Sequence, residues 1–277
     1  MNIYVVRRAT QGLANYIAKV DKKSQGVAIA YDSRHMSPEF AQEAACCLAA
    51  NGIKAYVFDS LRPTPELSYA VRKLGCIAGI NITASHNPKT DNGIKWIIQG
   101  EPPCPEMIQQ VGQSASVAFD LLHNMVIQPV QHEIVVKYCL EYQQALLNDI
   151  QLKRPFKVVL DGLNGSVGRC AALVLKKLGC DLTAIRCEAN GHFPDHAPDP
   201  SQEKNLAELK QTVLEQQADI GIALDGDGDR VVLIDEHGTT ISADRLLSLF
   251  SEMCLKTHPG HEVVFDVKCS TMVANTV

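Results

Sequence analysis

Three aspartates alternate with two glycines in the stretch DGDGDR, at Asp225, Asp227 and Asp229. Glycine tolerates the left-handed backbone angles of a tight loop, so the chain can curl and bring the three carboxylates together. Neighbouring negative charges destabilise one another unless a cation neutralises them. Because carboxylate oxygens are hard ligands, they favour magnesium or calcium over zinc. The spacing therefore predicts a site for a hard divalent cation.

Two other interpretations of this loop fit less well. A calcium EF-hand loop that began at Asp225 would have Glu236 at its last position, but Arg230 would stand where that loop needs glycine. The flanking stretches IGIAL and VVLID are typical of strands, whereas an EF-hand is flanked by helices. A solvated acidic turn would account for one Asp-Gly step, yet this loop has two such steps, a third aspartate and an arginine. The arginine adds a positive fork that suits a phosphate.

A second polar loop, TASHNP, follows an apolar run and places Ser85 next to His86. The Asn-Pro pair prevents a helix from continuing, so Ser85 is expected to be exposed on a tight turn. This stretch alone fits an ordinary polar turn. A Ser-His hydrolase is another alternative, but the stretch lacks the G-x-S-x-G elbow and no clear acid partner can be assigned. Phosphoryl transfer fits better, because a serine oxygen can carry a phosphate whose charge is offset by a cation and basic groups.

The two polar loops occupy equivalent places in a repeated pattern of elements. Each half of the chain alternates apolar strands with helices, and its third strand runs directly into one of the loops. Strands are predicted at residues 26–31, 53–58, 76–83, 156–162, 180–187 and 218–224. Such alternation implies a mostly parallel sheet that is covered on both faces. Ligands gather at the carboxyl ends of strands in these folds, which is where both loops would lie.

We therefore expect an α/β fold with two similar domains, each built on a mixed or parallel sheet, plus the first strand of a third. The expected domains cover residues 1–134, with the serine loop, and residues 135–256, with the aspartate loop. Residues 132–147 have helical spacing and lead into the second domain. Residues 257–277 would begin an incomplete third domain, in which EVVFDVK (262–268) predicts a strand. Because a strand cannot bury itself against a domain that is absent, we expect the chain to be truncated.

The composition is that of an ordinary globular protein, with 46% hydrophobic and 21% charged residues. No run approaches the ~20 apolar residues of a membrane span, and the first residues lack the pattern of a secretory signal. The net charge of -5 argues against a nucleic-acid partner. The 10 cysteines are scattered without a C-x-x-C pair, which favours free thiols in a reducing compartment. We expect a cytoplasmic protein with no membrane partner, and the sequence carries no signal for its oligomeric state.

The motifs ITASHNP, DNGIKW and LDGDGDR together resemble those of the α-D-phosphohexomutase family, which includes phosphomannomutase and phosphoglucomutase. The resemblance runs over nearly the whole chain. It implies an isomerase in which Ser85 carries a phosphoryl group and donates it to a hexose phosphate. The resulting hexose 1,6-bisphosphate would reorient and return its other phosphate. The resemblance also implies that Mg2+ is held by the three aspartates of LDGDGDR and by an oxygen of phosphorylated Ser85.

The same resemblance implies roles for four basic residues. His86 and Lys95, from SHNP and DNGIK, would act in catalysis by contacting phosphate or assisting proton transfer, although Lys95 by itself fits a surface lysine. Arg230 would bind phosphate, and Lys268 of DVKC would be a substrate contact from the third domain. Three aspartates nearly cancel the charge of the metal, so a phosphoserine needs further positive groups. Arg230 and Lys95 are the candidates for that role.

The choice of sugar depends on motifs that point in two directions. GHFPDHAPDP and FDVKC resemble the branch that acts on mannose and glucose phosphates, whereas DNGIK resembles phosphoglucosamine mutase. The R-G, E-x-S-G-H and R-x-S-x-T-E motifs of the family, which bind phosphate and sugar, have no counterpart in this sequence. We therefore expect a hexose-phosphate mutase of carbohydrate metabolism that truncation impairs. The alternatives are a phosphoglucosamine mutase and a non-catalytic remnant that binds magnesium or a phosphosugar.

Overall fold

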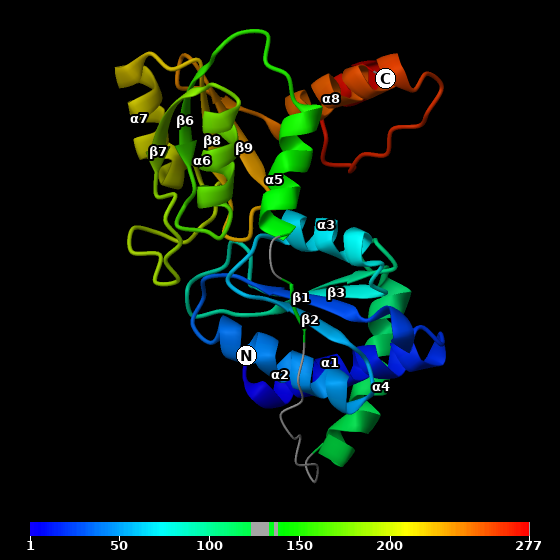
Figure 1. The fold of residues 1–277 in the computed structure, drawn as a ribbon. Coiled ribbons are helices and arrows are strands. Elements are labelled where there is room, and N and C mark those ends of the chain that lie inside the picture. Colours follow the sequence, from blue (N-terminus) through cyan, green and yellow to red (C-terminus); the bar gives the residue numbers. More distant parts are fainter. Residues whose placement is uncertain (123–132, 136–137, 277) are drawn as a thin grey trace.

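The computed structural model describes residues 1–122, 133–135 and 138–276 (Figure 1). Two five-stranded sheets, one from each half of the chain, account for the strands in these ranges. Both sheets mix parallel and antiparallel neighbours, and helices pack on each of them. The predicted α/β fold with two similar mixed-sheet units is therefore confirmed.

The first sheet has the strand order β4-β3-β1-β2-β5. Its strands are β1 (Val27–Tyr31), β2 (Ala55–Phe58), β3 (Ala78–Ile82), β4 (Ile94–Ile98) and β5 (Glu133–Val135). Neighbouring strands are parallel except for β4, which runs antiparallel to β3. The division that the sequence suggested after residue 134 falls inside β5, which pairs with β2. The domain boundaries stay a prediction.

The second sheet repeats this arrangement. Its strands are β6 (Lys157–Asp161), β7 (Asp181–Ile185), β8 (Ile220–Leu224), β9 (Val231–Asp235) and β10 (Thr240–Ile241), in the order β10-β9-β8-β6-β7. β9 is antiparallel to β8, just as β4 is antiparallel to β3, and β8, β6 and β7 are parallel. The β3–β4 loop with Ser85 and the β8–β9 loop with the three aspartates therefore hold the same position in the two sheets.

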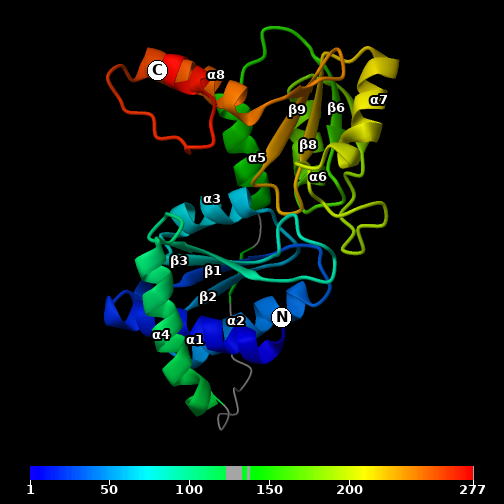
Figure 2. The ribbon, with the colours of Figure 1, turned by 180° about the vertical axis from the view of Figure 1, so that it is seen from behind.

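Helices cover both faces of the first sheet (Figure 2). They are α1 (Ile3–Lys19), α2 (Ser37–Ala50), α3 (Thr64–Leu74) and α4 (Pro105–Leu122). Val27 and Ile29 of β1 point into a core shared with α1, α2 and α4, whereas Ala28 and Ala30 point toward α3. The small alanines let α3 pack close to the sheet, and this places its first residue near the carboxyl ends of the strands. We call this sheet with its four helices the first unit.

The second sheet is covered in the same manner. Its helices are α6 (Gly168–Lys177) and α7 (Ala207–Gln216), which follows a short 3-10 turn. Leu209 and Val213 of α7 pack on Val159, Ala223 and Ile234 of the sheet, and α6 contacts β6 and β7. We call this sheet with these two helices the second unit. α5 (Tyr138–Asp149) connects the units and touches both α3 and α6.

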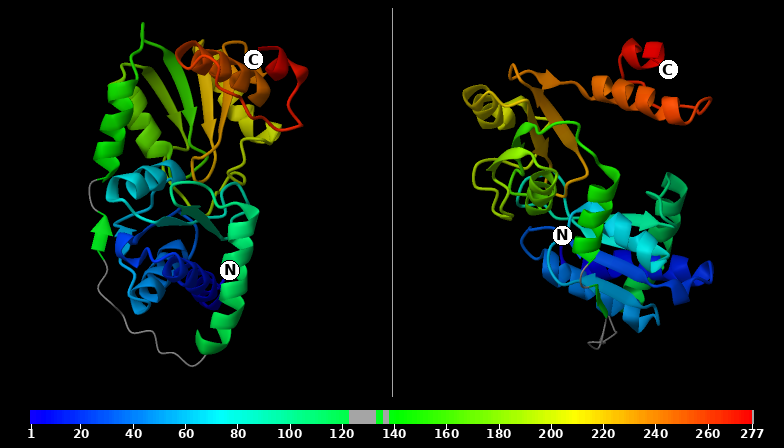
Figure 3. Two further views of the ribbon diagram at one scale, coloured as in Figure 1. Left: turned by 90° about the vertical axis from the view of Figure 1, so that its right-hand side faces the viewer. Right: turned by 45° about the horizontal axis from the view of Figure 1, so that its top comes forward.

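Two predicted elements differ in the structure. Residues 262–268, predicted as a strand, follow α8 (Ala243–Thr257) without regular structure and precede α9 (Thr271–Thr276). A strand requires a hydrogen-bonding neighbour, and among the described residues none lies beside this segment, which projects next to α8 in Figure 3. Residues 133–135, predicted as helical, form β5 because they pair with β2; His132 lies outside the described residues. α1 and β4 were not predicted at all.

Among the described residues, no helix has an apolar stretch long enough to span a bilayer. α1 illustrates why: its buried residues lie on one side only, against α2 and α4, while Tyr4 and Val5 are exposed. It is an amphipathic helix that covers a sheet.

The contact between α1 and α4 provides a stability test. A Cβ at Gly12 of α1 would lie 2.4 Å from the carbonyl oxygen of Val111, whereas a Cβ at Gly112 of α4 would meet no atom within 4 Å. Although alanine favours helices, we expect Gly12→Ala to lower the free energy of unfolding by about 1–3 kcal/mol through overpacking. The matched control, Gly112→Ala, is expected to raise it by about 0.5–1 kcal/mol. Urea unfolding followed by circular dichroism measures both, and a gain in both variants would contradict the close packing.

Candidate active site

The serine loop and the aspartate loop meet where the two units face each other. Ser85 Oγ donates a hydrogen bond to Asp225 Oδ2 at 2.7 Å, although the residues are 140 positions apart. The backbones are also close, because a Cβ at Gly226 would lie 2.3 Å from the carbonyl oxygen of Ser85. Only glycine fits there. The sequence predicted the two loops separately, and the structure brings them into one site.

The sequence suggested that Ser85 is exposed on a turn. In the structure Ser85 is buried, because the aspartate loop covers it. Its backbone is left-handed, with φ of 54°, which is uncommon for a residue with a side chain. The Ser85 N–H donates to Thr83 Oγ1 at 2.9 Å, and Thr83 donates in turn to Asp32 Oδ2 at 2.7 Å. This chain of hydrogen bonds holds the strained turn and points Oγ toward Asp225.

A buried arginine holds the rest of the serine loop. The Arg34 guanidinium is 0% exposed and pairs with Asp32 Oδ2 at 3.0 Å. It also donates to the carbonyl oxygens of four loop residues, Ser85, Asn87, Pro88 and Asp91, at 2.7–3.1 Å. The ring of Phe193, from the second unit, lies 5.1 Å from the guanidinium carbon. Sequence reasoning missed Arg34 and Asp32; the available signal was a charged D-x-R step directly after the first buried strand.

The three aspartates offer carboxylate oxygens that all lie within 4.8 Å of one another. Asp225 and Asp227 are buried, while Asp229 is partly exposed. Burial, together with the nearby charges of Asp227 and Asp229, raises the pKa of Asp225 to about 6. Asp227 Oδ1 is buried and has no hydrogen-bond partner among the described residues. An orphaned oxygen inside a group of mutually repelling carboxylates fits a hard cation, so the residues present suit Mg2+.

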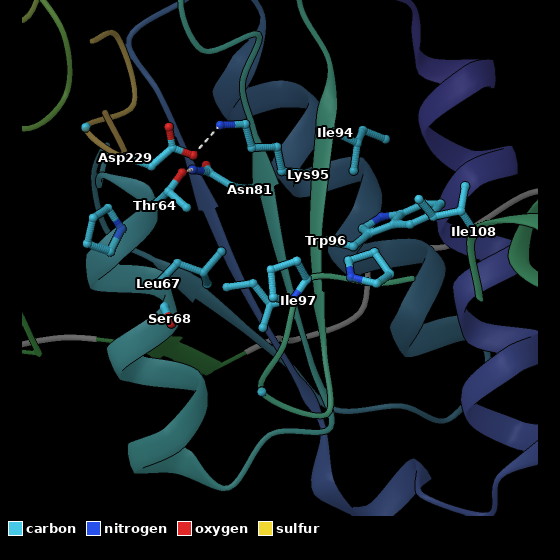
Figure 4. Close-up of a pocket in the computed structure, with 15 residues that line it drawn as sticks. Thr64, Leu67, Ser68, Asn81, Ile94, Lys95, Trp96, Ile97, Ile108 and Asp229 are labelled. Atoms are coloured by element: carbon cyan, nitrogen blue, oxygen red, sulfur yellow. Dashed lines mark hydrogen bonds and ion pairs between the residues drawn. The ribbon is translucent and has the colours of Figure 1, made fainter. Parts of the chain in front are cut away.

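Lys95, on β4, reaches into the aspartate loop (Figure 4). Its Nζ lies 2.7 Å from Asp227 Oδ2 and 2.6 Å from Asp229 Oδ2. Burial lowers the pKa of Lys95, but the hydrogen bonds and charges of the two aspartates outweigh it and raise that pKa. Thr64, the first residue of α3, donates from Oγ1 to Asp227 Oδ2 at 2.6 Å and accepts from Asn81. Lys95 is therefore part of the site and not a surface lysine.

His86 and Arg230 form the exposed rim of the same site. Arg230 Nη1 lies 2.6 Å from His86 Nδ1, so the guanidinium and the imidazole are neighbours at the rim. The same nitrogen lies 3.4 Å from Ser85 Oγ. Arg230 is half-exposed, with its guanidinium 3.9 Å from Asp229 Oδ1. An imidazole next to a hydroxyl can take part in proton transfer, and a half-exposed guanidinium can bind an anion.

Lys268 is not brought together with these residues. Its side chain is 86% exposed, and its ion pair is with Asp266 of its own segment. That segment follows α8 and lies beside this helix in Figures 1 and 2, away from the loops after β3 and β8. The role of Lys268 in substrate binding stays a prediction.

Comparisons with known proteins place this chain in a family. A family model described as phosphoglucomutase/phosphomannomutase, alpha/beta/alpha domain I, matches residues 1–117, and the domain II model of the same family matches residues 138–238. A phosphomannomutase/phosphoglucomutase of Pseudomonas aeruginosa is 37% identical over 245 residues, which cover 88% of this chain and 51% of that protein. A phosphoglucomutase of Neisseria meningitidis serogroup A is 33% identical over 275 residues, covering 98% of this chain and 57% of its own length.

A solved structure shows the same fold. The phosphoglucomutase/phosphomannomutase family protein of Burkholderia thailandensis superposes with a TM-score of 0.87 at 28% identity, over 100% of this chain and 61% of that one. The chain thus spans about half the length of the curated relatives that it matches. Two family models that follow one another along the chain, and relatives above 30% identity, show that this chain belongs to the phosphoglucomutase/phosphomannomutase family.

Proposed function

We propose that this chain carries the phosphoryl-transferring part of a hexose-phosphate mutase, with Ser85 as the residue that bears the phosphoryl group. The observation that carries the proposal is the hydrogen bond of 2.7 Å between Ser85 Oγ and Asp225, inside a group of three converging carboxylates. A serine held against a cation site and basic groups suits transfer of phosphate better than hydrolysis. Hexose phosphates and hexose 1,6-bisphosphate are the proposed substrates.

The residues around Ser85 have different roles in the transfer of the phosphoryl group. The bond between phosphorus and Ser85 Oγ breaks, and a bond to a sugar hydroxyl oxygen forms while that hydroxyl loses its proton. Nδ1 of His86 lies 3.4 Å from Oγ, so we assign His86 to proton transfer, in which the proton of the sugar hydroxyl ends on the leaving Ser85 Oγ. Lys95 and Arg230 supply positive charge on two sides of the loop and stabilise the transferring phosphoryl group. In the reverse step the bisphosphate returns a phosphoryl group to Ser85 Oγ.

The group of carboxylates is proposed to hold Mg2+. Asp225, Asp227 and Asp229 would be ligands, together with an oxygen of phosphorylated Ser85. The orphaned oxygen of Asp227 and the all-oxygen donor set support magnesium. When bound, the ion supplies Lewis-acid stabilisation of charge on the phosphoryl oxygens.

The sugar specificity is a separate proposal. The names of the relatives favour mannose and glucose phosphates, whereas phosphoglucosamine mutase and a non-catalytic phosphosugar-binding protein remain the alternatives. Conversion of glucose 1-phosphate, mannose 1-phosphate and glucosamine 1-phosphate by the purified chain, with the matching bisphosphate as activator, distinguishes the three. The cytoplasmic location also stays a prediction.

Phosphorylation of Ser85 is the first test. After incubation with glucose 1,6-bisphosphate and magnesium, mass spectrometry of peptides is expected to find phosphate on Ser85, because its Oγ contacts Asp225 of the carboxylate group. Ser85→Ala is expected to remove the label, while the control Ser24→Ala, at an exposed position, keeps it. Phosphate that persists in Ser85→Ala would show that another residue is the nucleophile.

Magnesium binding is the second test. Asp227→Asn removes one charge from the buried group, so isothermal titration calorimetry is expected to show an affinity for Mg2+ that is lower by at least about tenfold, or about 1.4 kcal/mol. Asp181→Asn makes the same chemical change at an exposed carboxylate on β7 and is expected to bind Mg2+ as the unaltered chain does. Equal affinity in both variants would place the metal elsewhere.

The serine loop depends on Arg34, which gives a third test. Lysine keeps the charge but cannot donate to four carbonyl oxygens at once, so Arg34→Lys is expected to slow phosphorylation of Ser85 by about a hundredfold through misplacement of Oγ. Affinity for Mg2+ should change less than about threefold, because Arg34 touches none of the three aspartates. The control is Arg72→Lys, whose guanidinium bonds to Ser68 on its own helix. An unchanged rate in Arg34→Lys would refute the positioning role.

A further inference from the structure

A cavity of about 400 Å3 lies where α3, α5 and α6 meet, on the side of α3 that faces away from β4. The Ser85 and Asp225 pair does not line it. Its lining includes Arg62, which precedes α3, and Glu66 of α3. Cys139 of α5 and Cys170 of α6 also line it. Two cysteines from different helices therefore line the same cavity at the junction of the two units.

The two cysteines line one cavity from helices that pack against each other. Gln143 Nε2 donates to Cys139 Sγ at 3.3 Å. Cys170 is buried at 8% exposure, whereas Cys139 is half-buried and open to the cavity. Cys139 is the second residue of α5, so its sulfur lies at a helix N-terminus, which favours a negative charge.

The charged groups around the pair treat the two sulfurs differently. The hydrogen bond from Cys170, helped by Arg62 and Gln143, outweighs burial and lowers the pKa of Cys139 to about 6. The hydrogen bond with Cys139, together with burial, raises the pKa of Cys170. Arg62 is shared with two carboxylates, Asp59 at 2.9 Å and Glu66 at 3.1 Å.

Burial raises the pKa of Glu66 to about 8, and Arg62 opposes this shift. On the α6 side, Arg169 is paired with Glu188 at 3.4 Å. Arg62 thus lowers the pKa of Cys139, while its partner Asp59 opposes that effect.

We propose that Cys139 and Cys170 form an oxidative modification site, in which Cys139 reacts with a hydroperoxide and Cys170 closes a disulfide. The Cys139 thiolate attacks one oxygen of hydrogen peroxide, the O–O bond breaks, and a sulfenic acid and hydroxide form. The Cys170 sulfur then displaces the sulfenic oxygen as water, with its thiol proton and one from solvent balancing the two steps. Both sulfurs are oxidised by one electron each, and the peroxide is reduced to two waters.

The disulfide would link α5, which follows the last strand of the first sheet, to α6 of the second unit. Ser166, which lines this cavity, donates from Oγ to the carbonyl oxygen of Gly226 in the aspartate loop at 3.1 Å. The modification would therefore join the two units at a cavity that borders this loop. The proposal does not depend on the mutase activity.

The test treats the full chain with hydrogen peroxide at pH 7, blocks free thiols with N-ethylmaleimide, and maps peptides by mass spectrometry. We expect one cross-linked peptide pair, Cys139 with Cys170, two hydrogens lighter than the reduced peptides and restored by dithiothreitol. Cys139 should be consumed at least about tenfold faster than the exposed control, Cys104. Equal rates for the two cysteines, or a disulfide between other positions, would overturn the proposal.

Two variants separate the roles of the sulfurs. In Cys170→Ser, Cys139 should stop at the sulfenic acid, which dimedone captures; in Cys139→Ser, Cys170 should stay reduced and alkylatable. Both replacements are small, and thermal unfolding checks that each variant remains folded. The rate at which iodoacetamide labels Cys139 should reach half of its plateau near pH 6. A free cysteine, with a pKa of about 8.5, would reach half of its plateau at that higher pH. Oxidation of Cys170 in Cys139→Ser at the unaltered rate would contradict the assignment.

Discussion

The hydrogen bond between Ser85 Oγ and Asp225 Oδ2 is the contact on which the rest of the site depends. It joins two loops that hold the same position in two similar sheets, after β3 in one and after β8 in the other. Their approach is possible only because Gly226 has no side chain, since a Cβ there would lie 2.3 Å from the Ser85 carbonyl oxygen. The serine loop and the aspartate loop thus form one site only where the two units meet.

Charge balance explains most of the remaining architecture. Two buried aspartates and a third beside them repel one another, and Lys95 offsets part of that charge from β4. A second, fully buried pair, Arg34 with Asp32, lies on the other side of Ser85 and organises the serine loop through its carbonyl oxygens. Removing one partner of this buried Arg34–Asp32 pair would leave an uncompensated charge, so the pair also ties the site to the stability of the first unit.

Local patterns in the sequence were enough to predict most of the fold. The strands around β1, β3, β6 and β8 were predicted because each is a short apolar run that ends in a polar loop. β4 was missed because IKWII follows turn residues and becomes a strand only by pairing with β3. The strand predicted at residues 262–268 was wrong for the converse reason, since an apolar run without a neighbour gains no ladder of hydrogen bonds.

The sequence by itself determined the chemistry of the site: three carboxylates with glycines between them, a serine on a turn after a strand, and basic residues near both. It could not show that Ser85 is buried, that Lys95 bridges Asp227 and Asp229, or that Arg34 holds the serine loop. Each of these facts is a contact between residues more than fifty positions apart or in different units. Spacing along the chain describes only what one loop can do, and tertiary packing decides which loops share a site and which charges compensate each other.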